Sequence, residues 1–315
     1  MASQDEIETE IALLERRLHE AKARLSALNP SPPSTPSSNS NSNSISNSNS
    51  NSISNSNSNI PFHPASSSTH FLLLLSDSAL PIGSFAFSSG LESFAAHNRS
   101  RSASFSSFLP LSLSSYASST LPFVLAAHRR PRTLAELDDQ LDAAVICTVG
   151  RRASVAQGRA LLSIWERSFK ATLLPSSSSS SSSSSISPDA LALSDFSALL
   201  RRESSKSGGE PPLVSAHLGP LFGAIAAVVG LSLRQTAYVF LLSHVKALVS
   251  AAVRANMFGP YQAQKMLASE HVQALINALV EREWHTSVEE AGQSVPVMDL
   301  WVGRHELLYS RIFNS

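Results

Sequence analysis

Apolar residues near the start of the chain recur in alternating steps of four and three, which is a heptad pattern. Between residues 5 and 28 the pattern comprises Ile7, Ile11, Leu14, Leu18, Ala21, Leu25 and Leu28. With Ile11, Leu18 and Leu25 at a positions, the flanking charges repel one another in a parallel homodimer and attract in an antiparallel arrangement. We therefore predict a coiled-coil-like helix at 1–28 that pairs antiparallel, binds a partner or its own domain, or stays a lone helix on a tether.

Two polar, low-complexity segments interrupt the chain after this helix. Residues 29–66 are mostly Asn and Ser with prolines, and residues 176–185 are ten consecutive serines. Such segments bury too little apolar surface to offset the entropy lost on ordering. We expect a disordered linker at 29–66 and one domain at 67–315, with a disordered Ser-rich insertion at about 175–212 that holds a short helix around residues 193–200.

Beyond the linker, apolar residues recur at helical rather than strand spacing. An apolar run at 71–75 meets the sequence Leu-Pro-Ile-Gly at 80–83, where proline and glycine stop a helix. After this turn, Ser84 is predicted to cap a second helix. That helix would carry Phe87, Leu91 and Phe94 on one face.

Signals for helix ends recur through the rest of the domain. Capping boxes predict helix starts at Thr133 with Glu136, Ser154 with Gln157, and Ser232 with Gln235. Gly259-Pro260 predicts the end of the helix after Ser232 and the start of another. This last helix would carry an apolar stripe of Ala268, Val272, Leu275 and Leu279. The fold class is thus predicted to be all-α, a single helical bundle of about seven to ten helices.

Composition excludes some classes of function and indicates the cellular compartment. The chain has 24 basic and 24 acidic residues, so it lacks the basic excess of a nucleic-acid-binding protein. Its single cysteine, Cys147, excludes an intramolecular disulfide and any CxxC site, which fits a reducing compartment. The acidic N-terminus lacks the apolar core of a signal peptide. We expect a cytoplasmic protein.

Two apolar segments, 213–231 and 237–253, permit a membrane-spanning alternative. The first contains His217, Gly219 and Pro220, and the second contains His244 and Lys246. Because a lysine near the centre of a bilayer costs a few kcal/mol, buried helices of a bundle explain both segments better. We keep a helical membrane protein as the alternative hypothesis and expect no membrane contact.

The chain carries no established catalytic motif. GxxxxGK[ST], GxSxG and HExxH are absent, and the histidines are scattered without the spacing of a shared metal site. Ser243 and Lys246 form an SxxK sequence, which would suit a hydrolase, but the SDN and KTG elements that support it are missing. We predict no catalytic residue, no metal ligand and no tightly bound cofactor.

The final segment, 296–315, mixes apolar and aromatic residues with charges, which disordered tails seldom do. Such a segment either docks on its own domain or binds another protein. The sequence leaves both interpretations open.

Five ordered blocks between about residue 70 and residue 315 resemble the UreF family of urease accessory proteins. The first block lies at residues 76–92, and the other four are 151–162, 217–231, 251–264 and 296–315. The first block is the family's signature opening, and its residues here are Ser76, Asp77, Leu80, Pro81, Gly83, Phe85, Gly90 and Glu92. The N-terminal extension and the serine insertion resemble additions in eukaryotic members.

This resemblance implies an all-α homodimer that scaffolds urease maturation and is not an enzyme. Such a protein links a nickel- and GTP-binding accessory GTPase to a UreD/UreH-type accessory protein docked on apo-urease, and it regulates GTP-dependent nickel insertion. The complex would handle the nickel, and the GTPase would supply the nucleotide loop. The resemblance implies partner contacts by Asp299, His305, Glu306, Ser310, Arg311 and Phe313 in the tail, and by Arg254, Gln262 and Gln264 elsewhere.

Overall fold

The computed structural model describes residue 16 and residues 64–98, 104–173, 187–205 and 212–315. The chain divides into two units, 1–59 and 60–315, and the described part of the second unit consists of helices and connecting turns without a strand. This confirms the all-α class. Apart from residue 16, the heptad helix predicted at 1–28 lies outside the described residues, as does the linker up to residue 63.

The first described helix, α2 (Pro64–Ser76), stops where the sequence predicts. A helix capped by Ser84, however, is a wrong prediction. Ser84 begins a 3-10 turn, η1 (Ser84–Ala86), and the next helix, α3 (Leu91–His97), starts only after Gly90. Gly83, Ser89 and Gly90 all take positive φ, at 75°, 49° and 86°, and a helix cannot run through such residues.

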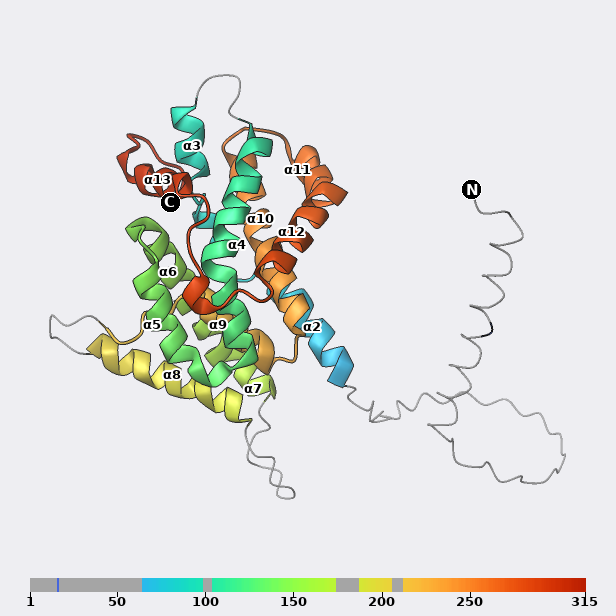
Figure 1. The fold of residues 1–315 in the computed structure, drawn as a ribbon, viewed down its shortest axis with the longest axis vertical. Helices are drawn as coiled ribbons and strands as arrows, with labels where there is room; N and C mark the ends of the chain where they lie inside the picture. The colour runs from blue at the N-terminus through green and yellow to red at the C-terminus, as the bar shows by residue number, and fades with distance from the viewer. Residues whose placement is uncertain (1–15, 17–63, 99–103, 174–186, 206–211) are drawn as a thin grey trace, which may run out of the picture. The chain divides into compact units, whose positions relative to one another are not determined.

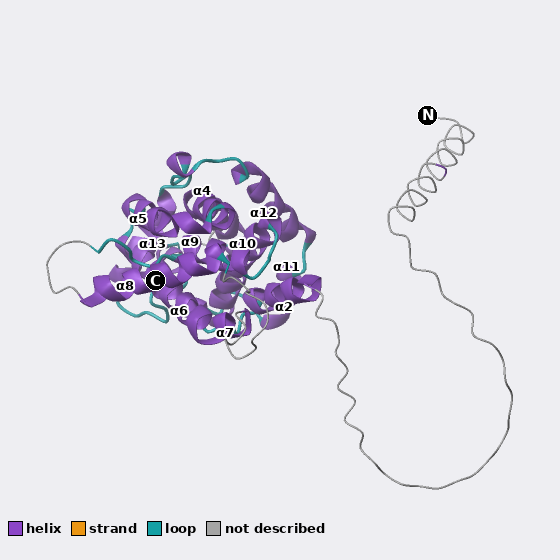
Figure 2. Cartoon of the chain, turned by 90° about the horizontal axis from the view of Figure 1, so that it is seen from below, coloured by secondary structure: helices purple, strands orange, loops and turns teal. Residues whose placement is uncertain are grey.

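At the centre of the bundle, α4 (Phe105–Arg129) packs against α9 (Leu218–Val228) and α10 (Leu233–Arg254). Figure 2 shows these three helices surrounded by the others. Gly223 permits a very close approach of α9 to α4, because a Cβ at this position would lie 2.2 Å from the carbonyl oxygen of Val124. The backbones of α9 and α4 are therefore in direct contact.

A proline within α4 leaves a backbone oxygen free to bind the C-terminal part of the chain. Pro122 has no N–H, so the carbonyl oxygen of Ser118 loses its helical donor. The amide of Gly292 donates to this oxygen instead, at 3.1 Å. The loop before the tail is thereby fixed to the central helix.

After η2 (Pro131–Thr133), helices α5 (Leu134–Ala144) and α6 (Thr148–Ile164) follow, and α6 continues through a π-helical turn, η3 (Trp165–Phe169), into α7 (Lys170–Leu173). The predicted helix start at Thr133 is confirmed, because α5 begins at Leu134, but neither of the capping boxes predicted in this region forms. Thr133 donates its hydroxyl to the carbonyl of Arg130 at 2.9 Å and makes no cap. Ser154 lies inside α6, where its Oγ contacts His217 Nδ1 at 3.0 Å.

A buried polar network attaches the segment before α9 to α5 and α6. The Asp138 carboxylate accepts the amides of Ser215, Ala216 and His217 at 2.6–2.9 Å. Asp142 accepts from Arg151 and from His217 Nε2, each at 2.7 Å. This network explains why His217 opens one of the family-like blocks.

The predicted insertion contains more structure than expected. Helix α8 (Pro188–Ser205) is 18 residues long and buries Leu193 and Phe196 in the core. It packs on α5 and α9 and is yellow in Figure 1. The short helix predicted around residues 193–200 is therefore present, but it is longer than expected, and residues 188–205 belong to the helical domain instead of to a disordered insertion.

Helix α10 begins as predicted, because Ser232 and Gln235 form a complete capping box. It ends at Arg254 rather than Gly259, since Asn256 takes a positive φ of 56°. The single helix predicted afterwards is two, α11 (Pro260–Leu267) and α12 (Glu270–Glu283). Ser269 caps the second by accepting from Val272 N at 3.3 Å.

Of the described helices, α10 is the one whose length and composition would suit a membrane span. Of its apolar window, 56% is buried within the protein, as in a core helix of a helical bundle. Helix α9, which accounts for the other apolar segment, has 11 residues and is too short to cross a bilayer. The structure therefore favours core helices over the membrane alternative.

Candidate functional site

The tail, residues 296–315, is docked on its own domain, beside the signature loop, residues 76–92. It contains α13 (Val297–Arg304) and a 3-10 turn, η5 (His305–Leu307), and follows another such turn, η4 (Val288–Glu290). Helix α13 packs against α3 and α6, and Figure 1 shows it beside α3. The last family-like block thus lies on the first.

Glu92 is the main anchor of the tail. Its carboxylate accepts from His305 Nε2 at 2.8 Å, from Ile312 N at 2.7 Å and from Phe313 N at 3.2 Å. The Glu92 side chain is only 12% exposed, and that of His305 is fully buried. Hydrogen bonds to an ionised, mostly buried carboxylate are among the stronger ones in proteins.

Gly90 allows the tail helix to approach the signature loop closely. A Cβ at this residue would lie 3.0 Å from the backbone nitrogen of Val302. Beside this contact, the ring of Phe94 packs edge-on against Trp301, with ring centroids 5.7 Å apart. The glycine of the signature therefore serves helix packing as well as its positive φ.

The end of the tail pairs with the middle of the signature loop. Asn314 N donates to Ala86 O at 2.8 Å, and Ser88 N donates to Ser315 O at 2.7 Å. Phe313 is buried, and the Arg254 guanidinium lies over its ring, 4.4 Å from the centroid. Arg254 also donates to the carbonyl of Phe85.

The first half of the signature loop is a sequence of tight turns. Asp77 Oδ1 accepts from Ala79 N at 2.9 Å, and the Asp77 carbonyl accepts from Leu80 N at 3.2 Å. The Ser76 carbonyl accepts from Lys246 Nζ at 2.6 Å, which fixes the end of α2 to α10. Lys246 therefore makes a structural hydrogen bond, whereas the hydrolase hypothesis would require it to act as a base toward Ser243.

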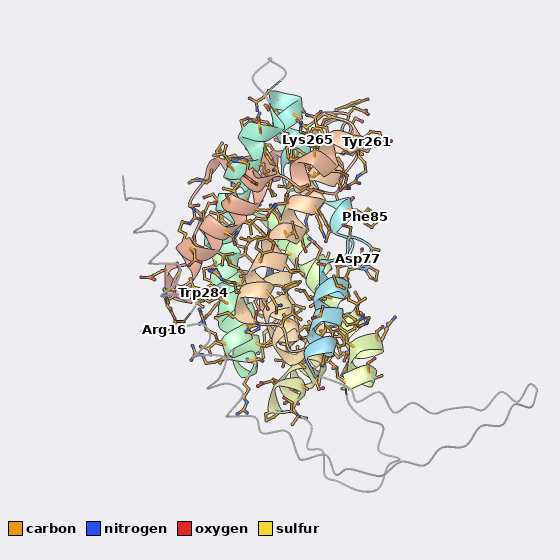
Figure 3. The ribbon with its side chains drawn as sticks, turned by 90° about the vertical axis from the view of Figure 1, so that its right-hand side faces the viewer. Arg16, Asp77, Phe85, Tyr261, Lys265 and Trp284 are labelled. Atoms are coloured by element: carbon orange, nitrogen blue, oxygen red, sulfur yellow. The ribbon has the colours of Figure 1, made fainter. Side chains whose placement is uncertain are left out.

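Several large side chains of the tail remain at the surface. Their exposed fractions are 62% for Leu300, 77% for Leu307, 108% for Tyr309 and 63% for Ile312. We call these four the exposed tail residues. Phe85 of the signature loop is 65% exposed as well, and Figure 3 shows it on the same edge as Asp77 and Tyr261.

The structure divides the residues that the resemblance assigned to partners. His305 and Phe313 are buried against their own domain. Asp299 is half-buried, and Glu306 pairs at the surface with Arg152. Ser310, Arg311, Gln262 and Gln264 are exposed, and Arg254 contacts both Phe85 and Phe313.

Sequence reasoning missed the exposed tail residues. They have the same apolar character as the buried residues of the tail, and only the docking against Glu92 decides which ones face outward. Within the described ranges, no group of three metal-ligating side chains occurs that could hold an ion.

Known proteins of similar sequence extend over most of this chain. The UreF family profile matches residues 100–271, which is more than half of the chain. A UreF-like urease accessory protein of Schizosaccharomyces pombe is 36% identical over 252 residues, covering 80% of this chain and 99% of the relative.

Plant and bacterial relatives are similar to this chain as well, with about the same coverage. Urease accessory protein F of Oryza sativa subsp. indica is 31% identical over 260 residues, covering 80% of this chain and 88% of the relative. Urease accessory protein UreF of Paenarthrobacter aurescens is 30% identical over 254 residues, covering 79% and 100%. The chain therefore belongs to the UreF family, which confirms the resemblance of its sequence blocks.

Proposed function

We propose that this chain is a non-catalytic adaptor in urease maturation. It joins a nickel- and GTP-binding GTPase to a UreD/UreH-type accessory protein that docks on apo-urease, and it regulates GTP-dependent nickel insertion in the cytoplasm. Its working form is a homodimer. Nickel is the cargo of the assembly and passes to urease, while this chain supplies binding surfaces.

The observation that carries the proposal is the presentation of the tail. Glu92 holds it by three hydrogen bonds, so four large apolar side chains are fixed at the surface instead of being buried. Exposing Leu307 and Tyr309 to water is unfavourable, and a partner that covers them recovers this free energy. The names of the relatives give the process in which such a partner acts.

We assign the tail to the UreD/UreH-type partner. Its accessible contacts are the exposed tail residues together with Glu306, Ser310 and Arg311. His305 and Phe313 are buried under the tail and hold it in place, and Arg254 packs over the ring of Phe313. Gln262 and Gln264, both exposed on α11, are assigned to a second partner surface.

The test is co-purification of the full chain with both accessory partners. In the double variant Leu307→Ser, Tyr309→Ser, we expect the UreD/UreH-type partner to be lost at least tenfold, because a central apolar anchor contributes on the order of 2 kcal/mol. The variant should keep its thermal stability, since both side chains are exposed.

Leu191→Ser on α8 is the matched control, because Leu191 is a 45% exposed leucine on a helix that packs on α5 and α9. It should leave the complex intact. Full-strength binding of the UreD/UreH-type partner to the tail double variant would disprove the assignment of this surface.

A further inference from the structure

A cavity of about 280 Å³ lies behind the signature loop. Its walls come from the signature loop, from α4, α6 and α10, and from Met298, Asp299 and Val302 of α13. Ligand sites in proteins commonly begin at about this volume, and an apolar cavity of roughly 150 Å³ already holds a benzene-sized molecule. The cavity therefore has room for a molecule of one or two rings.

The lining combines an apolar body with many hydroxyl groups. Leu75, Phe87, Leu141, Phe222 and Met298 contribute apolar surface. Hydroxyl groups come from one side of α4 and from α10, and they belong to Ser112, Ser115, Ser119, Thr120 and Ser243. Such a lining suits a ligand that has both apolar surface and a hydrogen-bonding group.

Two stacked rings provide the most specific polar groups. Tyr116 and His244 lie with centroids 4.1 Å apart and planes 15° from parallel, and His244 Nε2 is 3.0 Å from Ser112 Oγ. Burial lowers the pKa of His244 to about 4 and raises the pKa of Tyr116. Both groups are therefore neutral at pH 7.

The Tyr116 hydroxyl is available to a ligand. Among the described residues it has no hydrogen-bond partner, and Tyr116 is half-buried, so part of its surface stays accessible. That remaining area faces the cavity, since Tyr116 is one of its lining residues. An accessible hydroxyl without a protein partner can form a hydrogen bond to a bound molecule or to water.

Charge on the lining argues against an anionic ligand. Asp77 is exposed at the outer side, and Lys246 is occupied by the Ser76 carbonyl. The remaining charges of the lining are the carboxylates of Asp299 and of the terminal residue Ser315, and both disfavour an anion. The inner part of the cavity, around Tyr116 and His244, is neutral.

We propose that this cavity is a binding site for a small neutral molecule with an aromatic or aliphatic body and one hydrogen-bonding group. Its hydroxyl or amide pairs with Tyr116, and its body packs between Phe222 and Met298. This goes beyond the adaptor role, because it gives the chain a ligand of its own next to the tail.

The test uses the purified full-length chain and 2-naphthol, with naphthalene as the probe that lacks the hydroxyl. We expect saturable binding of one 2-naphthol per chain by fluorescence titration, together with a rise in melting temperature. Tyr116→Phe should weaken 2-naphthol about fivefold, the loss expected for one hydrogen bond, and should leave naphthalene unchanged.

Two further variants make the result decisive. Tyr261→Phe is the matched control, because Tyr261 is 92% exposed and does not line the cavity, so it should change nothing. Ala247→Leu fills the cavity from α10 and should abolish binding of both probes while the chain remains folded. The absence of saturable binding, which would mean a cavity that holds water only, would overturn the proposal. Equal affinities of Tyr116→Phe and Tyr261→Phe for 2-naphthol would overturn it too, because Tyr116 would then make no contact with the ligand.

Discussion

Single residues of the signature loop decide whether the tail is held. Glu92 is polar and Gly90 has no side chain, so neither would rank high in a list of core residues. In the structure, one accepts three hydrogen bonds from the tail and the other gives α13 room to pack. The sequence pattern of this loop is therefore explained by contacts with residues more than 200 positions away.

Glu92→Gln tests the anchor. The amide keeps the size of the side chain but loses its charge and one acceptor, so we expect the free energy of unfolding to fall by about 1–3 kcal/mol. Limited trypsin digestion should cut faster after Arg304 and Arg311. Glu281→Gln is the control, because its pair with Arg234 is over half exposed and contributes little. Equal cleavage rates in wild type and Glu92→Gln would contradict the anchoring role.

Gly90→Ala tests the close approach of α13. The residue has φ of 86°, and a Cβ would lie 3.0 Å from Val302 N, so strain and a clash act together. We expect the substitution to cost about 1–3 kcal/mol of stability in chemical denaturation. Gly292→Ala, where a Cβ meets nothing within 4 Å, should cost far less. Similar losses in the two variants would show that crowding at Gly90 is unimportant.

At the scale of the helices, local signals predicted some boundaries and missed others for identifiable reasons. The Ser232 box succeeded because both members are exposed and free to bond locally. Ser154 failed because its hydroxyl contacts His217, 63 positions away. Ser84 failed because its hydroxyl donates to Gln157 Oε1, at 2.9 Å. In both cases the hydroxyl bonds to a distant partner, and after Ser84 the positive φ of Ser89 and Gly90 also prevents a helix. A single sequence does not reveal such distant partners.

The network that joins α5, α6 and α9 gives a pH-dependent prediction. Burial alone would raise the pKa of Asp142, but hydrogen bonds from Arg151, His217 and Ser215 outweigh it and lower the pKa from 3.8 to about 2. Because the folded-state pKa is below the unfolded one, this group stabilises the fold above about pH 4. The contribution, about 2 kcal/mol, is lost as the pH falls from about 4 to 2.

Asp142→Asn should remove this contribution. Urea denaturation between pH 5 and pH 2 is the measurement, and the variant should show a shallower loss of stability over the acid range than wild type. Asp195→Asn, an exposed aspartate on α8, should leave the wild-type profile unchanged. Parallel profiles for Asp142→Asn and wild type would exclude this role of the network.

For the whole molecule, periodicity was enough to predict the all-α class and the family-like blocks were enough to predict the family. The candidate site was predicted less completely. Its location in the tail came from the resemblance, whereas the division into anchoring residues such as Phe313 and exposed ones such as Leu307 depends on tertiary docking. Residues 188–205 show the same limit, because apolar spacing predicted only a short helix there, whereas its full length and its place in the core depend on packing against α5 and α9.

The adaptor account is tested most directly by urease activity per urease polypeptide in cells that lack this chain, with and without excess nickel. The account predicts a normal amount of urease polypeptide, little activity, and recovery when the wild-type chain is supplied. Urease that is fully active without this chain, at ordinary nickel, would contradict it.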